Sequence, residues 1–185
     1  EEIGARFSES GVITFFEAGT GALRSRLQIP VPEGERVIAF GSGESRRSLF
    51  IYGFSDGSVL PLKVDYTQSF TDGVREIRPK LAFPLGEEPT VLGDGAIEEY
   101  SAVTVVEGRG GYVVAGGTED GDLVMALFTT RTNLMTGAVE KRREDFSLPS
   151  IGRPVRQILV NEALRNLFVV DDRGHLFNFD IVDRN

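Results

Sequence analysis

The stretch LFIYGFSDGSVL at residues 49–60 decides the fold. An apolar run rich in aromatic residues leads into the turn Ser55-Asp56-Gly57, and an alternating run follows, which is the pattern of a β-hairpin. The same order of strand, acidic-glycine turn and strand returns in YVVAGGTEDGDLV at residues 112–124 and LFVVDDRGHL at residues 167–176. The turns recur at intervals of roughly 50 to 65 residues, slightly longer than a typical propeller blade. The chain is therefore predicted to consist of repeats of one short-stranded unit.

Another apolar run precedes each of these hairpins, which makes three strands per unit. These runs lie at residues 37–40, 100–106 and 155–160. A fourth strand is expected at residues 75–83 and at residues 138–146, each closed by Pro84 or Pro149, because proline cannot continue a sheet ladder. Apolar residues are nowhere sustained at helical spacing, so helix content should be small. We expect an all-β fold, a β-propeller-like array of antiparallel three- to four-stranded blades.

The whole chain, residues 1–185, is predicted to form one such domain. Its units span approximately residues 37–84, 98–149 and 155–185, and an extra hairpin occupies residues 11–29. The third unit is one strand short, so the extra hairpin either completes that blade or is the tail of a preceding one. We favour an incomplete propeller, whose bare blade faces would make the isolated chain dimerise or aggregate.

Composition excludes several classes of protein. The net charge of −8 argues against a nucleic-acid partner, because binding to phosphates needs an excess of Lys and Arg on one face. The one basic run, Lys141-Arg142-Arg143, is interpreted as a solvated strand face, with a contact patch as the alternative. The absence of cysteine excludes disulfides and thiolate-bound zinc. No stretch approaches the roughly 20 apolar residues that span a bilayer, and residues 1–4 lack the pattern of a signal peptide.

Two features suggest catalysis, and both have a structural interpretation. Residues 53–57, GFSDG, match the G-x-S-x-G nucleophile motif of serine hydrolases, which requires a strand that turns sharply into a helix. Here an alternating β-run follows instead, and the turns at residues 119–121 and 172–174 have no serine. His175, the single histidine, flanks the third turn, and the sequence shows neither an orienting partner nor a nucleophile for it. We predict no catalytic residue and no enzyme activity.

Metal and cofactor sites are not expected either. Glu119, Asp120 and Asp122 could offer oxygen ligands to calcium, but the spacing of a calcium loop is absent and a hairpin turn accounts for them. Three glycine pairs fail the G-x-G-x-x-G pattern and open no helix, so they are interpreted as turns rather than phosphate cradles. The pairs are Gly19 and Gly21, Gly41 and Gly43, and Gly93 and Gly95.

Aromatic residues are spread along the predicted strands, where packing between sheets is the default interpretation. A binding platform requires that some of them be exposed. They include Phe15, Phe16, Phe50, Tyr52, Phe54, Tyr112, Phe128, Phe168, Phe177 and Phe179.

The segment GFSDGSV at residues 53–59 resembles blades of WD40-like propellers, although the chain has no tryptophan for the Trp-Asp dipeptide of that family. Together with VDDRG at residues 170–174, it looks like the propeller-type insert of PstC-type phosphate ABC transporter permeases. The resemblance implies a domain on the periplasmic side of the bacterial inner membrane, between two membrane helices. It implies no transport residue in this chain, because the membrane helices and the ATPase-coupling loop are not part of the matched segments.

The function expected from this resemblance is that of a non-catalytic accessory domain in phosphate import. It would act through protein–protein interaction or regulation, with other transporter subunits or a substrate-binding protein as partners. The alternative is a generic WD40-like scaffold that binds a protein partner. Membrane helices encoded on either side of this segment are required only by the first hypothesis.

Overall fold

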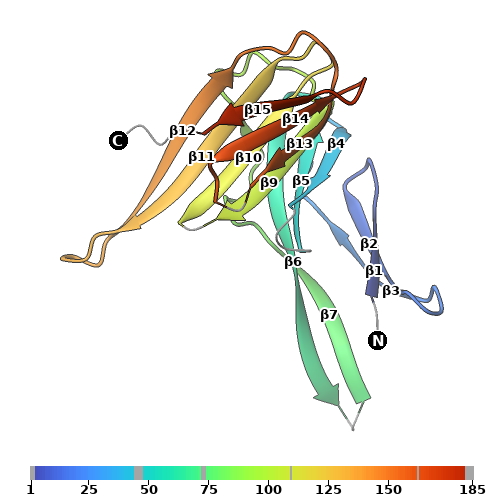
Figure 1. Cartoon of the computed structure of the whole chain (residues 1–185). Coiled ribbons are helices and arrows are strands. Elements are labelled where there is room, and N and C mark those ends of the chain that lie inside the picture. The colour runs from blue at the N-terminus through green and yellow to red at the C-terminus, as the bar shows by residue number, and fades with distance from the viewer. Residues whose placement is uncertain (1–2, 44–47, 72–73, 109, 162, 182–185) are drawn as a thin grey trace.

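The computed structural model describes residues 3–43, 48–71, 74–108, 110–161 and 163–181. In these residues every regular element is a strand, and the strands form four antiparallel sheets (Figure 1). No helix among them is long and apolar enough to cross a membrane. The predicted all-β class is therefore confirmed, and the last residues of the third predicted unit, 182–185, lie outside the described part.

The first sheet has the strand order β1-β2-β3, and the second has the order β4-β5-β6-β7, with β8 added against β6. Their strands are β1 (Ile3–Phe7), β2 (Val12–Glu17), β3 (Leu23–Gln28), β4 (Val37–Ser42), β5 (Leu49–Phe54), β6 (Ser58–Thr71), β7 (Val74–Ala82) and β8 (Thr90–Val91). The strand expected at residues 75–83 is β7. Neither β1 nor β8 was expected from the sequence.

The third sheet has the order β9-β10-β11-β12, and the fourth has the order β13-β14-β15. Their strands are β9 (Ala102–Gly108), β10 (Gly111–Gly117), β11 (Leu123–Thr132), β12 (Val139–Leu148), β13 (Val155–Val160), β14 (Asn166–Asp171) and β15 (Leu176–Asp180). The strand expected at residues 138–146 is β12. Each sheet is thus built from consecutive strands, as in the blades of a propeller.

The three repeated hairpins turn through equivalent glycines, Gly57, Gly121 and Gly174, whose φ angles are +75°, +92° and +79°. Each glycine N–H donates to the carbonyl three residues earlier, on Phe54, Thr118 or Asp171. This left-handed conformation is accessible to glycine at little cost, which explains why the turn sequence recurs.

The sheets follow one another in an open row (Figure 1). β3 contacts β7, β9 lies against β4 and β5, and β13 lies against β9 and β10. In the described residues no strand pairing joins the first sheet to the fourth. The extra N-terminal hairpin therefore does not complete the last blade; with β1 it forms a sheet of its own, because β1 supplies the third strand.

Three apolar clusters hold the row together, one at each junction between sheets. The first junction centres on Phe15, Tyr52 and Leu62, the second on Ile51, Val105 and Val114, and the third on Val113, Leu167 and Val169. These side chains are almost completely buried. Sheet-to-sheet burial of this kind is the main favourable contribution to the stability of the fold.

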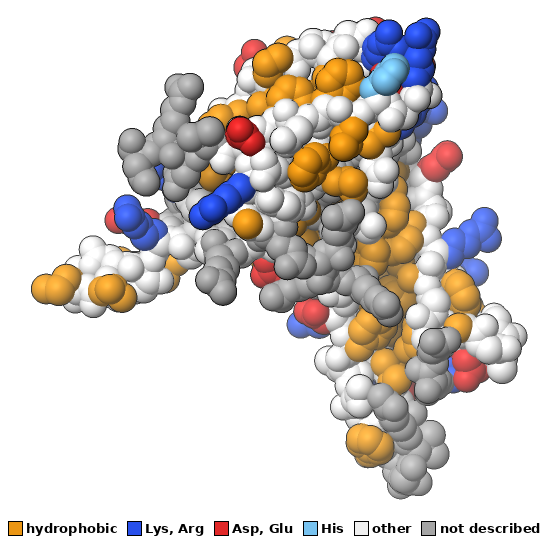
Figure 2. Space-filling model, viewed as in Figure 1, with side chains coloured by type: hydrophobic (Ala, Val, Ile, Leu, Met, Phe, Trp, Pro, Cys, Tyr) orange, Lys and Arg blue, Asp and Glu red, His pale blue; other side chains and the backbone are white. Residues whose placement is uncertain are grey.

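Two hairpins extend beyond the row as arms (Figure 1). We call the β6–β7 hairpin the first arm and the β11–β12 hairpin the second arm. Along the second arm the register continues to the pair Thr132 and Val139, and the first arm pairs to Thr71 and Val74. Exposed apolar side chains lie on both, including Phe70 on the first arm and Leu134 and Met135 at the tip of the second (Figure 2).

Candidate functional site

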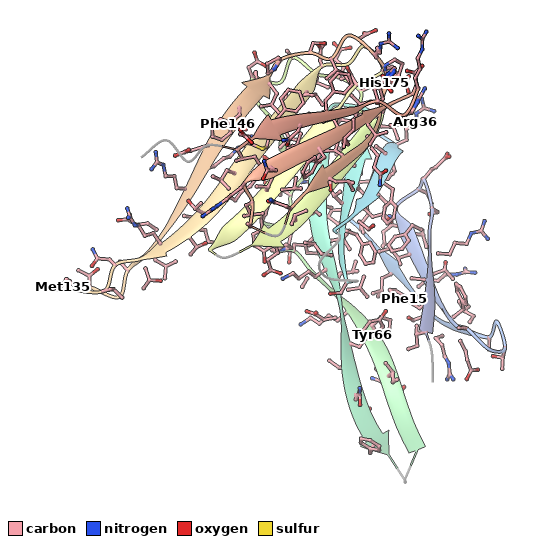
Figure 3. All side chains as sticks on the ribbon, viewed as in Figure 1. Phe15, Arg36, Tyr66, Met135, Phe146 and His175 are labelled. Atoms are coloured by element: carbon pink, nitrogen blue, oxygen red, sulfur yellow. The ribbon has the colours of Figure 1, made fainter. Side chains whose placement is uncertain are left out.

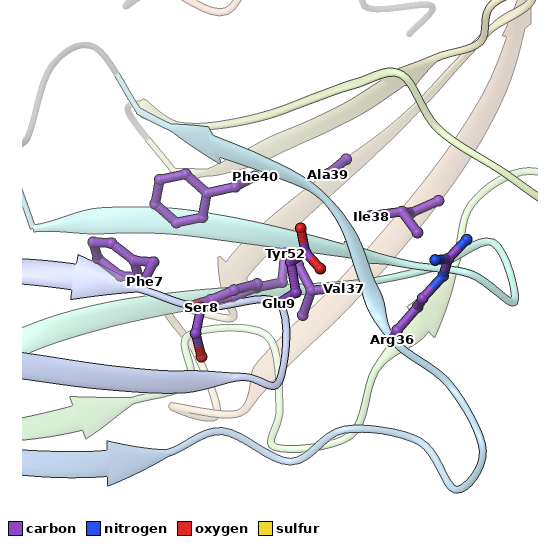
Figure 4. Close-up of a pocket in the computed structure, with 9 residues that line it drawn as sticks. All are labelled: Phe7, Ser8, Glu9, Arg36, Val37, Ile38, Ala39, Phe40 and Tyr52. Atoms are coloured by element: carbon purple, nitrogen blue, oxygen red, sulfur yellow. The ribbon is translucent and has the colours of Figure 1, made fainter.

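A pocket of about 390 Å³ lies between the first and second sheets (Figure 4). Its wall consists of the end of β1, the loop that follows, the start of β4, and β5. The lining residues are Phe7, Ser8, Glu9, Arg36, Val37, Ile38, Ala39, Phe40 and Tyr52. A β-bulge interrupts the pairing of β4 with β5 between Val37 and Ala39. Such bulges often re-aim side chains next to binding sites.

Aromatic rings make up the apolar side of this pocket. The ring of Phe40 lies 4.4 Å from that of Phe7 and 5.4 Å from that of Tyr52, and Phe7 also contacts Phe50 at 4.9 Å between centroids. Aromatic pairs at these separations contribute about 0.5–1.5 kcal/mol each beyond the burial of their area. Phe40 nevertheless remains 44% exposed, so the cluster presents an aromatic surface to a ligand or partner.

Tyr52 contributes a polar atom to the same cluster. Its side chain is almost completely buried, and within the described residues its hydroxyl has no hydrogen-bond partner. Burial raises the pKa of Tyr52 well above its ordinary value, so the phenol stays protonated at neutral pH. A buried, unpaired hydroxyl costs about 1–3 kcal/mol. The accessible part of the pocket, at the Phe40 ring, suits contact with an apolar group.

Ser55, the serine of the hydrolase-like motif, lies beside this pocket in the turn between β5 and β6. Its hydroxyl donates to the Glu35 carboxylate at 2.6 Å and accepts from the backbone N–H of Arg36 at 3.0 Å. The strand β6 follows the turn, so the strand-to-helix geometry of a nucleophile elbow is not formed. The contacts of Ser55 fasten the turn to the segment before β4.

His175 has an orienting partner that the sequence did not reveal. Its Nδ1 lies 2.8 Å from Oδ2 of Asp171, whose Oδ1 accepts from the backbone N–H groups of Arg173 and His175. Burial opposes ionisation of Asp171, but these hydrogen bonds outweigh it and lower the pKa of the carboxyl to about 2. His175 itself lies at the surface (Figure 3), and the pair closes the hairpin turn of the fourth sheet.

Two of the three acidic residues considered for calcium, Glu119 and Asp122, take part in other contacts. Glu119 forms an ion pair with Arg156 at 2.5 Å, and the backbone N–H of Asp122 donates to the Thr118 hydroxyl. No group of three or more potential metal ligands was found where the structure describes the chain. These residues form the hairpin turn before β11.

The glycine pair Gly41 and Gly43 was predicted to form a turn, but the structure places it at the end of a strand. Gly41 lies within β4 and Gly43 directly follows it, and a Cβ at either position would collide with the backbone carbonyl of Val103 or Val105 in β9. The prediction of a turn was wrong here. These two glycines allow the backbones of β4 and β9 to approach closely, which requires residues without a side chain.

The basic run lies within β12, and its side chains Arg142 and Arg143 form ion pairs. Arg142 binds Glu144 at 2.6 Å, and Arg143 binds Asp145 at 2.7 Å. Arg143 also donates to the Val91 carbonyl and lies over the ring of Phe128. Arg143 therefore connects β12 to the loop that carries β8.

Sequence reasoning missed a partly buried ionic contact between the second and third sheets. The Nζ atom of Lys63 donates to Glu107 at 2.9 Å and to the Tyr112 hydroxyl at 3.1 Å. Burial lowers the pKa of Lys63, but the two hydrogen bonds outweigh this and raise it above its ordinary value. The available signal was a lysine within the otherwise apolar run at residues 59–64.

Neither a family model nor a curated protein matches the chain. Among solved structures, the crystal structure of Raptor from Chaetomium thermophilum is similar over 100% of this chain and 19% of its own, with 16% identity and a TM-score of 0.43. The chain thus spans about a fifth of the length of that protein. The consecutive antiparallel sheets, each stacked on the next, decide the architecture. The fold is propeller-like.

Proposed function

We propose that this chain is a non-catalytic accessory domain of a phosphate ABC transporter permease, placed on the periplasmic side, which binds a protein partner. The likeness of residues 53–59 and 170–174 to the insert of PstC-type permeases supports the assignment to a transporter. The proposed binding function rests on two exposed apolar side chains at the tip of the second arm.

At that tip, Leu134 is 96% exposed and Met135 is 94% exposed (Figure 3). The turn that presents them is ordered by its own hydrogen bonds. Oδ1 of Asn133 accepts from the backbone N–H groups of Met135 and Thr136, and the N–H of Gly137 donates to the Asn133 carbonyl. A turn fixed in advance lowers the entropy cost of binding, and adjacent exposed apolar side chains mark interaction sites.

A photo-crosslinking amino acid at position 135 of the full-length protein tests this function in cells. We expect crosslinks to another subunit of the transporter or to its substrate-binding protein. The double variant Leu134→Ser/Met135→Ser should reduce phosphate uptake, whereas Val91→Ser, which changes an exposed apolar residue elsewhere, should not. Absence of any protein crosslink would contradict the binding function.

The alternative function is that of a WD40-like scaffold outside phosphate transport. The aromatic pocket at Phe7, Phe40 and Tyr52 favours it, because a pocket of this type recognises a peptide side chain without help from a transporter. A crosslink to a protein unrelated to transport, with phosphate uptake unchanged in both variants, would support this alternative over the first proposal.

A further inference from the structure

Equivalent positions lie on one face of the second, third and fourth sheets. Each set is defined relative to the turn glycine of its sheet, which is Gly57, Gly121 or Gly174. Its members are the sixth and the fourth residue before that glycine and the second residue after it. The set is Ile51, Gly53 and Val59 in the second sheet, Ala115, Gly117 and Leu123 in the third, and Phe168, Val170 and Leu176 in the fourth.

In the second sheet this face is covered by the first strand of the third. Ile51 and Val59 are fully buried, and a Cβ at Gly53 would lie 3.3 Å from the Val103 side chain of β9. The inner strand of one blade therefore packs against the equivalent positions of the blade before it.

The third sheet repeats this arrangement with the fourth. Ala115 is 0% exposed and Leu123 is 3% exposed, and a Cβ at Gly117 would lie 2.6 Å from the Val155 side chain of β13. The face is thus a blade-docking surface wherever a following blade is present.

Among the residues that the structure describes, no strand covers the same face of the fourth sheet. Leu176 is 64% exposed, and Phe168, Val170 and Leu159 are only partly buried. Leu159 pairs across the sheet with Phe168, and Val170 pairs with Leu176, so the four side chains are contiguous. Hydrophobic side chains lie over these strands in Figure 2. We call this surface the C-terminal face.

At the other end of the row, the first sheet also has a face that none of the described strands covers. Its Ile13 and Phe15 point toward the second sheet, so Phe16, with its cross-strand partner Leu23, faces outward. Leu23 is 58% exposed, and the Phe16 ring lies over Gly4. We call this surface the N-terminal face.

The two faces have complementary charge along the strands. On the N-terminal face, the row after Phe16 and Leu23 consists of Arg6, Thr14 and Arg26, which are cross-strand partners. On the C-terminal face, the row at the end of the apolar side chains contains Asp180 paired with Asn166. On both faces the side chains change from apolar to charged along the direction of the first strand of the sheet. The charged side chains are basic on the N-terminal face and acidic on the C-terminal face.

We infer that the C-terminal face of one chain docks the N-terminal face of a second copy. The occupant is a β-sheet because every equivalent face in the row is covered by one, and the second copy is favoured by the apolar and charged match. Two copies joined at both ends would give a closed ring of about eight blades, within the range seen in propellers. The contact is heterologous, and two of them close the ring.

Two charged substitutions test this inference, one on each face. Leu176→Asp and Leu23→Asp change exposed side chains, so both variants should keep the circular dichroism spectrum of the parent chain. At concentrations below the dissociation constant of the dimer they should also keep its melting temperature, because no partner then stabilises the native state. Light scattering and sedimentation of the 185-residue chain should show a dimer. Each substitution should raise the dissociation constant at least tenfold, whereas Leu134→Asp at the arm tip should leave it unchanged.

Mixing the two variants provides the decisive measurement. The Leu23→Asp variant keeps its C-terminal face intact, and the Leu176→Asp variant keeps its N-terminal face intact. These two intact faces can bind each other in the mixture, so the mixture should associate more tightly than either variant alone. A parent chain that stays monomeric at high concentration would overturn the inference. Undiminished dimerisation of Leu23→Asp would also overturn it, because two C-terminal faces would then be pairing with each other.

Discussion

Replacing Gly57 by alanine should destabilise the protein far more than the same change at Gly174. Both glycines occupy the same turn position with nearly equal φ angles of +75° and +79°. A residue with a Cβ in this conformation costs about 1 kcal/mol at either site. At Gly57 the added Cβ would also lie well below 3.0 Å from the Ile97 carbonyl, whereas nothing lies within 4 Å at Gly174.

The second cost at Gly57 arises because a backbone atom cannot rotate away. Overpacking of this kind costs typically about 1–3 kcal/mol, so the total loss at Gly57 should be about 2–4 kcal/mol. For a chain of this length, about 1 kcal/mol lowers the melting temperature by about 2–4 °C. We therefore expect Gly174→Ala to melt a few degrees below the parent chain and Gly57→Ala roughly 5–15 °C below it.

Thermal and urea unfolding of the two variants, followed by circular dichroism, measure this difference. Equal losses of stability at the two sites would refute the reasoning, because the φ cost alone would then explain both. An unchanged Gly57→Ala variant would show that the turn at Gly57 does not pack against the loop before β9.

Three further predictions concern side chains in the turns and between the sheets. Ser55→Ala should lose about 1 kcal/mol of stability with its hydrogen bond to Glu35, and a fluorophosphonate probe should not label the parent chain; labelling at this serine would contradict the structural role. The low pKa of Asp171 stabilises the fold above about pH 4, and this stability should disappear as the pH falls toward 2; in Asp171→Asn, which cannot accept from His175 as a carboxylate, unfolding should lose that acid-dependent step. Lys63→Met should lower the free energy of unfolding by about 1–3 kcal/mol, because it removes the Lys63 cation from the partly buried carboxylate of Glu107. If this difference between variant and parent disappeared at high salt, the ion pair would instead behave as a solvent-exposed one.

The repeated hairpins were predictable because their signals are local. Turn glycines with positive φ and alternating apolar residues are visible within a dozen residues, as around Gly57 and Gly174. The strand β1 was missed because residues 3–7, IGARF, contain only a short and weakly alternating pattern. Its position depends on pairing with β2, which the sequence of β1 does not specify.

The candidate site was less predictable because distant segments create it. Phe7, Phe40 and Tyr52 come from three strands, and their contact depends on how the first two sheets meet. Similarly, the role of Gly41 depends on the approach of β9, a tertiary contact that no turn pattern reveals. Sequence alone could indicate that aromatic residues were present but not which of them would remain exposed.

The assembly of every sheet from consecutive strands has a consequence for how the chain folds. No strand has to find a partner from the other end of the sequence, so each sheet can form through short loop closures before the sheets stack. The cooperativity of folding then depends on nearest-neighbour junctions, as in linear repeat proteins. The first and fourth sheets each have one such junction and the inner two have two. In native-state hydrogen exchange, the amides of the first and fourth sheets should therefore exchange first. The amides of β5, β9 and β10, in the two inner sheets, should exchange last.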